Sequence, residues 1–106
     1  MQLQGRTALV TGAGSGIGKA AALVLAQEGA RIAAFGLTDE ELRDTVAEIT
    51  NAGGEAAPFV ADVGEPDQLY RAINQALEYF GQLDIVFANA GINGVWAPIE
   101  EISPAD

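Results

Sequence analysis

Four glycines stand close together near the start of the chain, in the run Thr11-Gly12-Ala13-Gly14-Ser15-Gly16-Ile17-Gly18. A compact apolar segment, residues 7–10, precedes this run, and a helical pattern begins near Gly16. Glycine has no Cβ, so the backbone can turn sharply after a strand and a ligand can approach it closely. The N–H groups at a helix start and the positive end of the helix dipole favour a phosphate. The run therefore predicts a phosphate-binding turn between a strand and a helix.

Composition limits the classes of protein to which the chain can belong. Its 106 residues predict one domain covering residues 1–106, and a hydrophobic content of 49% is typical of a globular protein. Fifteen acidic residues against five basic ones give a net charge of −10, which argues against nucleic acid and anionic membranes as partners. There is no cysteine and no histidine, so we expect no disulfide and no metal site. No apolar run reaches the roughly 18 residues of a membrane span, and we expect a cytoplasmic protein.

Around the glycine-rich run, the pattern predicts a strand over residues 7–11 and a helix over residues 17–28. Gly29 follows the last turn of this helix as a stop signal. Helical spacing predicts one buried face on the helix. Its members are Ile17, Ala21, Val24 and Leu25.

Further elements alternate along the chain. Strands are expected over residues 32–35, 56–60 and 84–88. A capping box, with Thr38 as N-cap and Glu41 three residues later, predicts the start of a second helix that ends before Gly53. A third helix is expected to begin at Pro66 and to end at Gly81. The apolar stripes of these two helices are Leu42, Val46 and Ile49, and then Leu69, Ile73, Ala76, Leu77 and Phe80.

This alternation predicts an α/β fold: a Rossmann-type parallel sheet with helices on both faces. Residues after Asn89 are expected to be irregular, because glycine, asparagine and proline recur there. The final residues, Ser103-Pro104-Ala105-Asp106, carry the start signals of a fourth helix. A helix start at the last residue predicts a polypeptide truncated after the fourth strand.

The glycine spacing alone leaves several nucleotide-binding folds to compare. The dinucleotide fingerprint G-x-G-x-x-G is not met. When Gly12 and Gly14 are taken as its first two glycines, Ile17 occupies the position of the third. The loop of nucleotide triphosphatases is nearly met, but Ala13 replaces its first glycine and Ala20 replaces its magnesium-binding hydroxyl residue. A methyltransferase would carry acids where Val10 and Gly36 stand in this chain.

Three motifs follow three of the expected strands: Thr11-Gly12-x-x-x-Gly16-x-Gly18, Asp62-Val63 and Asn89-Ala90-Gly91. In these motifs the sequence resembles the short-chain dehydrogenase/reductase family, and the likeness covers essentially all 106 residues. One departure is Ala88, where the family usually has a first asparagine before Asn89. The resemblance implies a nicotinamide dinucleotide bound across the carboxyl ends of the strands.

The resemblance also implies roles for particular residues. The pyrophosphate turn would consist of Gly12, Ser15, Gly16, Ile17 and Gly18. Asp62 would accept a hydrogen bond from the adenine amino group, and the Val63 backbone would contact the ring. The adenosine ribose would be flanked by Asn89, Ala90 and Gly91. Read without the family, Asp62 is a common turn-forming residue.

The sequence does not decide between NAD and NADP as the cofactor. Dinucleotide folds usually carry an acid after the second strand for the ribose diol, or an arginine for a 2′-phosphate. This chain has Gly36-Leu37-Thr38 there. The missing acid favours NADP, because no carboxylate repels the 2′-phosphate. The missing arginine does not favour NADP, because no cation binds that phosphate, and Thr38 could contact the ribose of either cofactor.

The family's catalytic serine, tyrosine and lysine cannot be assigned in this chain. Tyr70 and Tyr79 are followed four residues later by Asn74 and Leu83, not by lysine. We therefore expect hydride transfer between an NAD(P) cofactor and a small alcohol or ketone only in a full-length protein, which we expect to be a homo-oligomer. Two alternatives remain: a non-catalytic dinucleotide-binding or regulatory module, and a nucleotide triphosphatase.

The expected strand order is 3-2-1-4. It would leave the fourth strand, with its apolar run Ile85-Val86-Phe87, unpaired at the edge of the sheet. An apolar open edge is a template for aggregation. This order therefore predicts marginal stability or self-association of the chain. Val95, Trp96 and Ile99 are candidates for the rim of a substrate pocket or for apolar packing.

Overall fold

The structure, a computed structural model, describes residues 2–88 and 95–98. Strands and helices alternate as the sequence predicts, and every predicted bound lies within one residue of the observed one. The order is β1 (Thr7–Thr11), α1 (Gly16–Gln27), β2 (Arg31–Gly36), α2 (Asp39–Asn51), β3 (Glu55–Val60), α3 (Pro66–Phe80), β4 (Ile85–Ala88) and β5 (Val95–Pro98).

The strands form one sheet in the order β3-β2-β1-β4-β5. β1 lies between β2 and β4 and is parallel to both, and β3 is parallel to β2. The predicted order 3-2-1-4 is therefore confirmed. Because these four strands are parallel, their carboxyl ends meet along one edge of the sheet.

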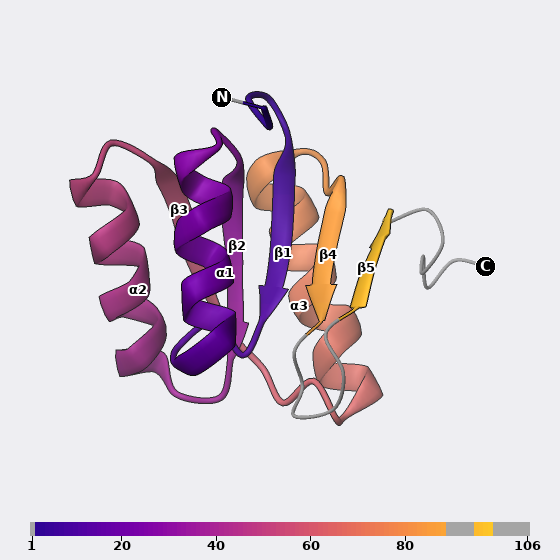
Figure 1. Cartoon of the computed structure of the whole chain (residues 1–106). Helices are drawn as coiled ribbons and strands as arrows, with labels where there is room; N and C mark the ends of the chain where they lie inside the picture. The colour runs from indigo at the N-terminus through magenta and orange to yellow at the C-terminus, as the bar shows by residue number, and fades with distance from the viewer. Residues whose placement is uncertain (1, 89–94, 99–106) are drawn as a thin grey trace.

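Helices α1 and α2 lie on one face of this sheet and α3 lies on the other (Figure 1). Each face has its own hydrophobic core. Successive strand residues point to opposite faces, so Ala8 and Val10 of β1 pack with α1 and α2, whereas Leu9 packs with α3. Phe35 extends the α3 core from β2, where it is fully buried beside Phe59. Helices thus cover both faces, as predicted.

The buried face of α1 differs from the predicted one. Gly18, Ala22 and Leu25 are buried, whereas Ile17 is 70% exposed and Val24 is 58% exposed. Small residues bring the helix axis close to the strands, and this close approach decides which face is buried. The predicted face is therefore wrong except at Leu25 and at half-buried Ala21.

The carboxyl-terminal part of the sheet also corrects a prediction. Residues 95–98 form β5, which pairs antiparallel with β4, so the region after Asn89 is not irregular throughout. β4 is not an open edge: Phe87 pairs with Trp96, and Val86 with Ala97. A short connection can return only antiparallel, and the backbone groups of β4 gain partners in this way. The predicted fourth-helix start, residues 103–106, lies outside the described residues.

Helix ends follow the sequence signals in part. Pro66 occupies the first turn of α3, and Gly81 ends the helix in a left-handed conformation with φ 83°. Thr38 is the N-cap residue of α2, but its side chain makes no capping hydrogen bond, so the predicted capping box does not form. Leu42 and Ile49 are buried as predicted, and Leu77 is 38% exposed.

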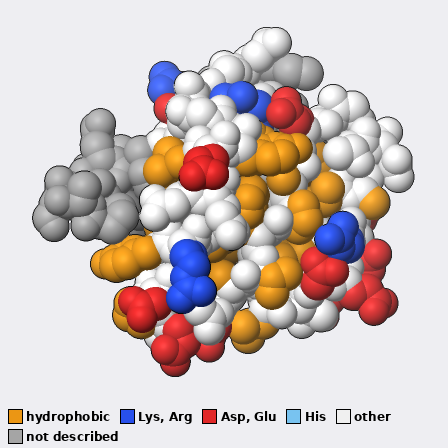
Figure 2. All heavy atoms as spheres, turned by 180° about the vertical axis from the view of Figure 1, so that it is seen from behind, with side chains coloured by type: hydrophobic (Ala, Val, Ile, Leu, Met, Phe, Trp, Pro, Cys, Tyr) orange, Lys and Arg blue, Asp and Glu red, His pale blue; other side chains and the backbone are white. Residues whose placement is uncertain are grey.

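Seen from behind, hydrophobic side chains gather among the charged ones (Figure 2). On α3, Tyr70, Leu77 and Tyr79 are exposed.

No helix within the described residues is long and apolar enough to span a membrane.

Candidate functional site

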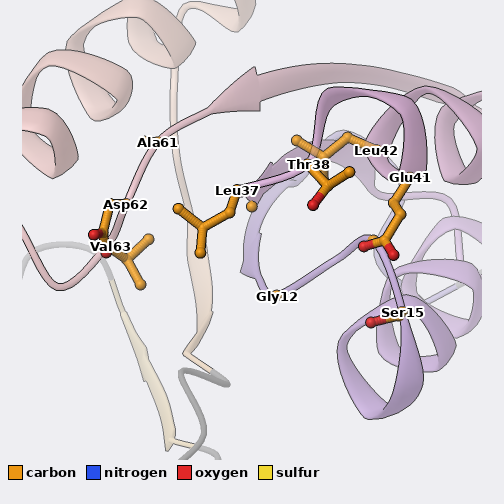
Figure 3. A pocket seen from close by; sticks show the side chains of 11 residues that line it. Gly12, Ser15, Leu37, Thr38, Glu41, Leu42, Ala61, Asp62 and Val63 are labelled. Carbon is orange, nitrogen blue, oxygen red and sulfur yellow. The ribbon is translucent and has the colours of Figure 1, made fainter.

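A cleft of about 350 Å³ lies at the carboxyl ends of β1, β2 and β3 (Figure 3). Three segments line it: the glycine-rich turn, the connection from β2 into α2, and the residues after β3. The lining residues are Gly12, Gly14, Ser15, Gly36, Leu37, Thr38, Glu41, Leu42, Ala61, Asp62 and Val63. Its volume is within the range of small-molecule sites.

The glycine-rich turn connects β1 directly to α1. Gly12 and Gly16 have positive φ angles, 63° and 59°, which residues with a Cβ rarely adopt. α1 begins at Gly16, and no acidic residue occupies its first turn. Its start therefore offers backbone N–H groups and the positive end of a dipole, and the first turn of α1 itself carries no carboxylate.

Gly18 sets the distance between α1 and the turn. A Cβ at this position would lie 2.0 Å from the carbonyl oxygen of Gly12 and 2.9 Å from that of Thr11. Both contacts are with backbone atoms, which cannot rotate away. Only glycine allows the helix to start so close to the end of β1.

The turn is also held by hydrogen bonds to β2 and α2. The Ala13 N–H donates to the carbonyl oxygen of Phe35 at 3.0 Å. On the other side, the buried hydroxyl of Thr45 donates to the carbonyl oxygen of Ala13 at 2.9 Å. Hydrogen bonds to β2 and α2 thus help to fix the backbone conformation of the residues between β1 and α1.

The opposite wall of the cleft carries Asp62 and Val63. The Asp62 carboxylate accepts a 2.9 Å hydrogen bond from the Gly64 N–H, and the Asp62 N–H donates to Oε1 of Gln68. Asp62 is therefore a turn former, as its residue type suggests, and its side chain also lines the cleft (Figure 3). Val63 is half-buried against the core on the α3 face.

The structure brings four of the ten predicted site residues to the lining of one cleft. Gly12, Ser15, Asp62 and Val63 line the cleft, and Gly16 lies between Ser15 and Ile17 at the start of α1. Gly18 lies behind the turn, buried, and Ile17 is exposed beside it. Asn89, Ala90 and Gly91 lie outside the described residues.

Two residues of this region were missed by sequence reasoning. Glu41 was expected to cap α2, but its side chain lines the cleft beside Gly14. Thr45 interrupts an apolar stripe of α2, between Leu42 and Ile49, and that polar residue at a buried position was the available signal. A buried hydroxyl requires a hydrogen-bond acceptor, which Ala13 provides.

The sequence pattern of the short chain dehydrogenases matches residues 6–106. The chain belongs to the short-chain dehydrogenase family. Versicolorin reductase of Emericella nidulans is 42% identical over 104 residues, which are 97% of this chain and 39% of that relative. An uncharacterized oxidoreductase of Thermotoga maritima is 42% identical over 106 residues, 100% of this chain and 41% of that protein.

Solved structures of short-chain dehydrogenases and related reductases share the fold. A 3-ketoacyl-ACP reductase from Sinorhizobium meliloti superimposes with a TM-score of 0.78 at 50% identity, over 93% of this chain and 39% of that one. A dehydrogenase/reductase from the same organism gives a TM-score of 0.82 at 42% identity. The match covers 99% of this chain and 42% of that one. The chain spans about two fifths of the length of the curated relatives named above.

Proposed function

We propose that the cleft binds the adenosine and pyrophosphate part of a nicotinamide dinucleotide, and that residues 1–106 form a single, partial NAD(P)-binding domain. The observation that carries this proposal is the Gly18–Gly12 contact, since only a glycine lets α1 begin where a pyrophosphate could meet its first N–H groups. When bound, such a cofactor supplies hydride transfer to or from an alcohol or ketone.

Within this proposal, each cleft segment has a task. The pyrophosphate would lie over Gly12, Ser15 and Gly16, with Ile17 and Gly18 completing the turn. The adenine would lie toward Asp62, whose carboxylate has a second oxygen besides the one bonded to Gly64. Asn89, Ala90 and Gly91 would flank the ribose, because β4 ends at Ala88 on the same edge of the sheet.

The activity that this proposal assigns to the full-length protein is that of an NAD(P)-dependent alcohol dehydrogenase or ketone reductase. The names of the two relatives above, a reductase and an oxidoreductase, support it. The 106 residues contain no Tyr-x-x-x-Lys sequence. We therefore propose that this chain binds the cofactor and does not itself transfer hydride, and that small alcohols or ketones and self-association into an oligomer belong to the full-length protein.

Dinucleotide binding is tested by titrating the chain with NADH and NADPH and following the nicotinamide fluorescence. Gly16→Val introduces a branched side chain at positive φ in the turn and should abolish binding. Gly53→Val is its matched control, because Gly53 also has positive φ, 94°, and open space around it, but lies after α2, away from the cleft. Circular dichroism of each variant verifies folding.

Two results would contradict the proposal. One is the absence of binding of either dinucleotide to a folded chain. The other is tighter binding of ATP with magnesium than of both dinucleotides, which would favour the nucleotide triphosphatase alternative. The alternative of a non-catalytic dinucleotide-binding module is favoured if the chain binds a dinucleotide but the full-length protein transfers no hydride to or from alcohols or ketones.

A further inference from the structure

The side chain of Glu41 leaves the first turn of α2 and lies against the glycine-rich turn. A Cβ on Gly14 would be 2.8 Å from the Cβ of Glu41 and 3.0 Å from its Oε1. In the close view of the cleft, its carboxylate lies between Thr38 and Ser15 (Figure 3). A negative charge therefore stands at the wall formed by the glycine-rich turn and the start of α2.

No positive charge lines the cleft to balance this carboxylate. The opposite wall carries a second one, Asp62, and none of the chain's five basic residues is a lining residue. The two basic residues on the neighbouring helices are already paired. Lys19 forms an ion pair with Glu48, and Arg43 is bonded to Asp39 at 2.7 Å.

The remaining three basic residues lie elsewhere. Arg6 precedes β1 at the opposite edge of the sheet, 3.8 Å from Asp84. Arg31, at the start of β2, lies over the ring of Phe80. Arg71 is on α3 and lines a separate hollow with Val60. Among the described residues, the charged side chains that line the cleft are thus the carboxylates of Glu41 and Asp62.

The two nicotinamide dinucleotides differ only at the adenosine ribose, which carries a 2′-hydroxyl in NAD(H) and a 2′-phosphate in NADP(H). A carboxylate accepts hydrogen bonds from ribose hydroxyls, whereas a phosphate monoester carries about −1.5 to −2 charges and is repelled by a neighbouring carboxylate. In dinucleotide folds the acid that contacts the ribose stands about 20 residues beyond the glycines, and Glu41 lies in that range. The residue at the end of β2, where dinucleotide folds usually carry this acid, is Gly36.

We propose that Glu41 is the specificity-determining residue of this cleft and that it selects NAD(H) against NADP(H). This inference rests on the proposed dinucleotide site. It replaces the tendency toward NADP that the missing acid after β2 suggested, because the carboxylate is supplied from α2 instead. Leu37, which is 70% exposed at the cleft, offers a 2′-phosphate no hydrogen-bond donor from its side chain.

The test compares NADH and NADPH titrations of the full chain with those of Glu41→Gln and Glu40→Gln. Glu40 is also exposed and lies in the same helical turn, so its variant loses the same charge near the same dipole, but it does not line the cleft. We expect the native chain to bind NADH more tightly. Glu41→Gln should tighten NADPH binding by roughly tenfold, while the affinity for NADH changes less, because glutamine keeps an acceptor for the ribose. Glu40→Gln should leave the ratio of the two dissociation constants unchanged.

Ionic strength provides an independent readout. Added salt screens exposed charges, so the preference of the native chain for NADH should decrease with salt, and that of Glu41→Gln should change less. Equal affinities for NADH and NADPH in the native chain, or equal ratios in Glu41→Gln and Glu40→Gln, would overturn the inference and leave dinucleotide binding intact. If neither dinucleotide binds to a folded chain, the proposed function fails, and the inference fails with it.

Discussion

The hydroxyl of Thr45, in the middle of α2, donates a hydrogen bond to the carbonyl oxygen of Ala13, in the middle of the glycine-rich turn. Both residues are buried, and the same hydroxyl lies 3.2 Å from the carbonyl oxygen of Glu41. One helix thus carries both the side chain that holds the turn and the side chain that charges the cleft. The position of α2 therefore determines the shape of the turn and the field above it.

Thr45→Val should destabilise the fold by about 1–3 kcal/mol, because the carbonyl oxygen of Ala13 loses its side-chain donor in a buried place. Thr45→Ser keeps the hydroxyl and should recover most of this loss. Urea denaturation of the three proteins measures the difference. Equal stability of the valine and serine variants would show that the hydrogen bond does not matter for stability.

Gly18→Ala and Gly16→Ala separate a steric effect from a conformational one. The added Cβ at Gly18 would overlap the Gly12 carbonyl, and we expect a loss of roughly 3 kcal/mol, the upper end for overpacking. At Gly16 the space is open, and only the positive φ opposes alanine, which should cost about 1–2 kcal/mol. Thermal unfolding ranks the two variants. A smaller loss for Gly18→Ala than for Gly16→Ala would contradict the close approach described for α1.

Asp62 has a structural task that can be separated from its proposed contact with adenine. Asp62→Ala removes the acceptor of the Gly64 N–H and should cost about 0.5–1.5 kcal/mol. Asp62→Asn keeps an acceptor oxygen at the same place and should be nearly as stable as the native chain. Denaturation curves test this order, and comparable losses in both variants would mean that the charge, rather than the acceptor, stabilises the turn.

Lys19 should make stability depend on pH at the alkaline end. Its hydrogen bond to Glu48, together with the charges of Glu48, Asp44 and Glu41, raises the pKa of Lys19 above its usual value of 10.5. The folded chain therefore holds this proton more tightly than the unfolded chain. The stabilisation is complete below about pH 10.5 and is lost as the pH rises through the folded pKa.

Glu48→Gln removes the dominant partner of Lys19, so its stability should fall less steeply above pH 10.5 than that of the native chain. Glu40→Gln serves as the control, since Glu40 makes no ion pair with Lys19 among the described residues. Urea midpoints measured between pH 9 and pH 12 provide the comparison. Parallel curves for the native chain and Glu48→Gln would disprove the coupling.

The sequence was sufficient for the elements from β1 to β4, because strand runs, helix stops and glycines are local signals. Their alternation was also sufficient for the order of the four parallel strands. It was not sufficient for the side of α1 that is buried. Hydrophobicity favoured Ile17 and Val24, whereas close packing on the sheet selected Gly18 and Ala22. The direction of the Glu41 side chain was likewise undetermined, because the capping box and the cleft are equally compatible with its place in the chain. β5 depends on a pairing with β4 that no local pattern reveals.

The strand order has a consequence for folding kinetics. β1 comes first among the described strands along the chain and lies inside the sheet, between β2 and β4. One edge of β1 can pair with β2 soon after synthesis, whereas the other edge pairs with β4, which is made much later. Beside β4, the Thr7 N–H donates to Asp84, 77 residues further along the chain. Contacts of such long sequence separation carry the largest loop-closure entropy and form late. During synthesis, the central strand therefore has an open edge until nearly the whole described chain has been made.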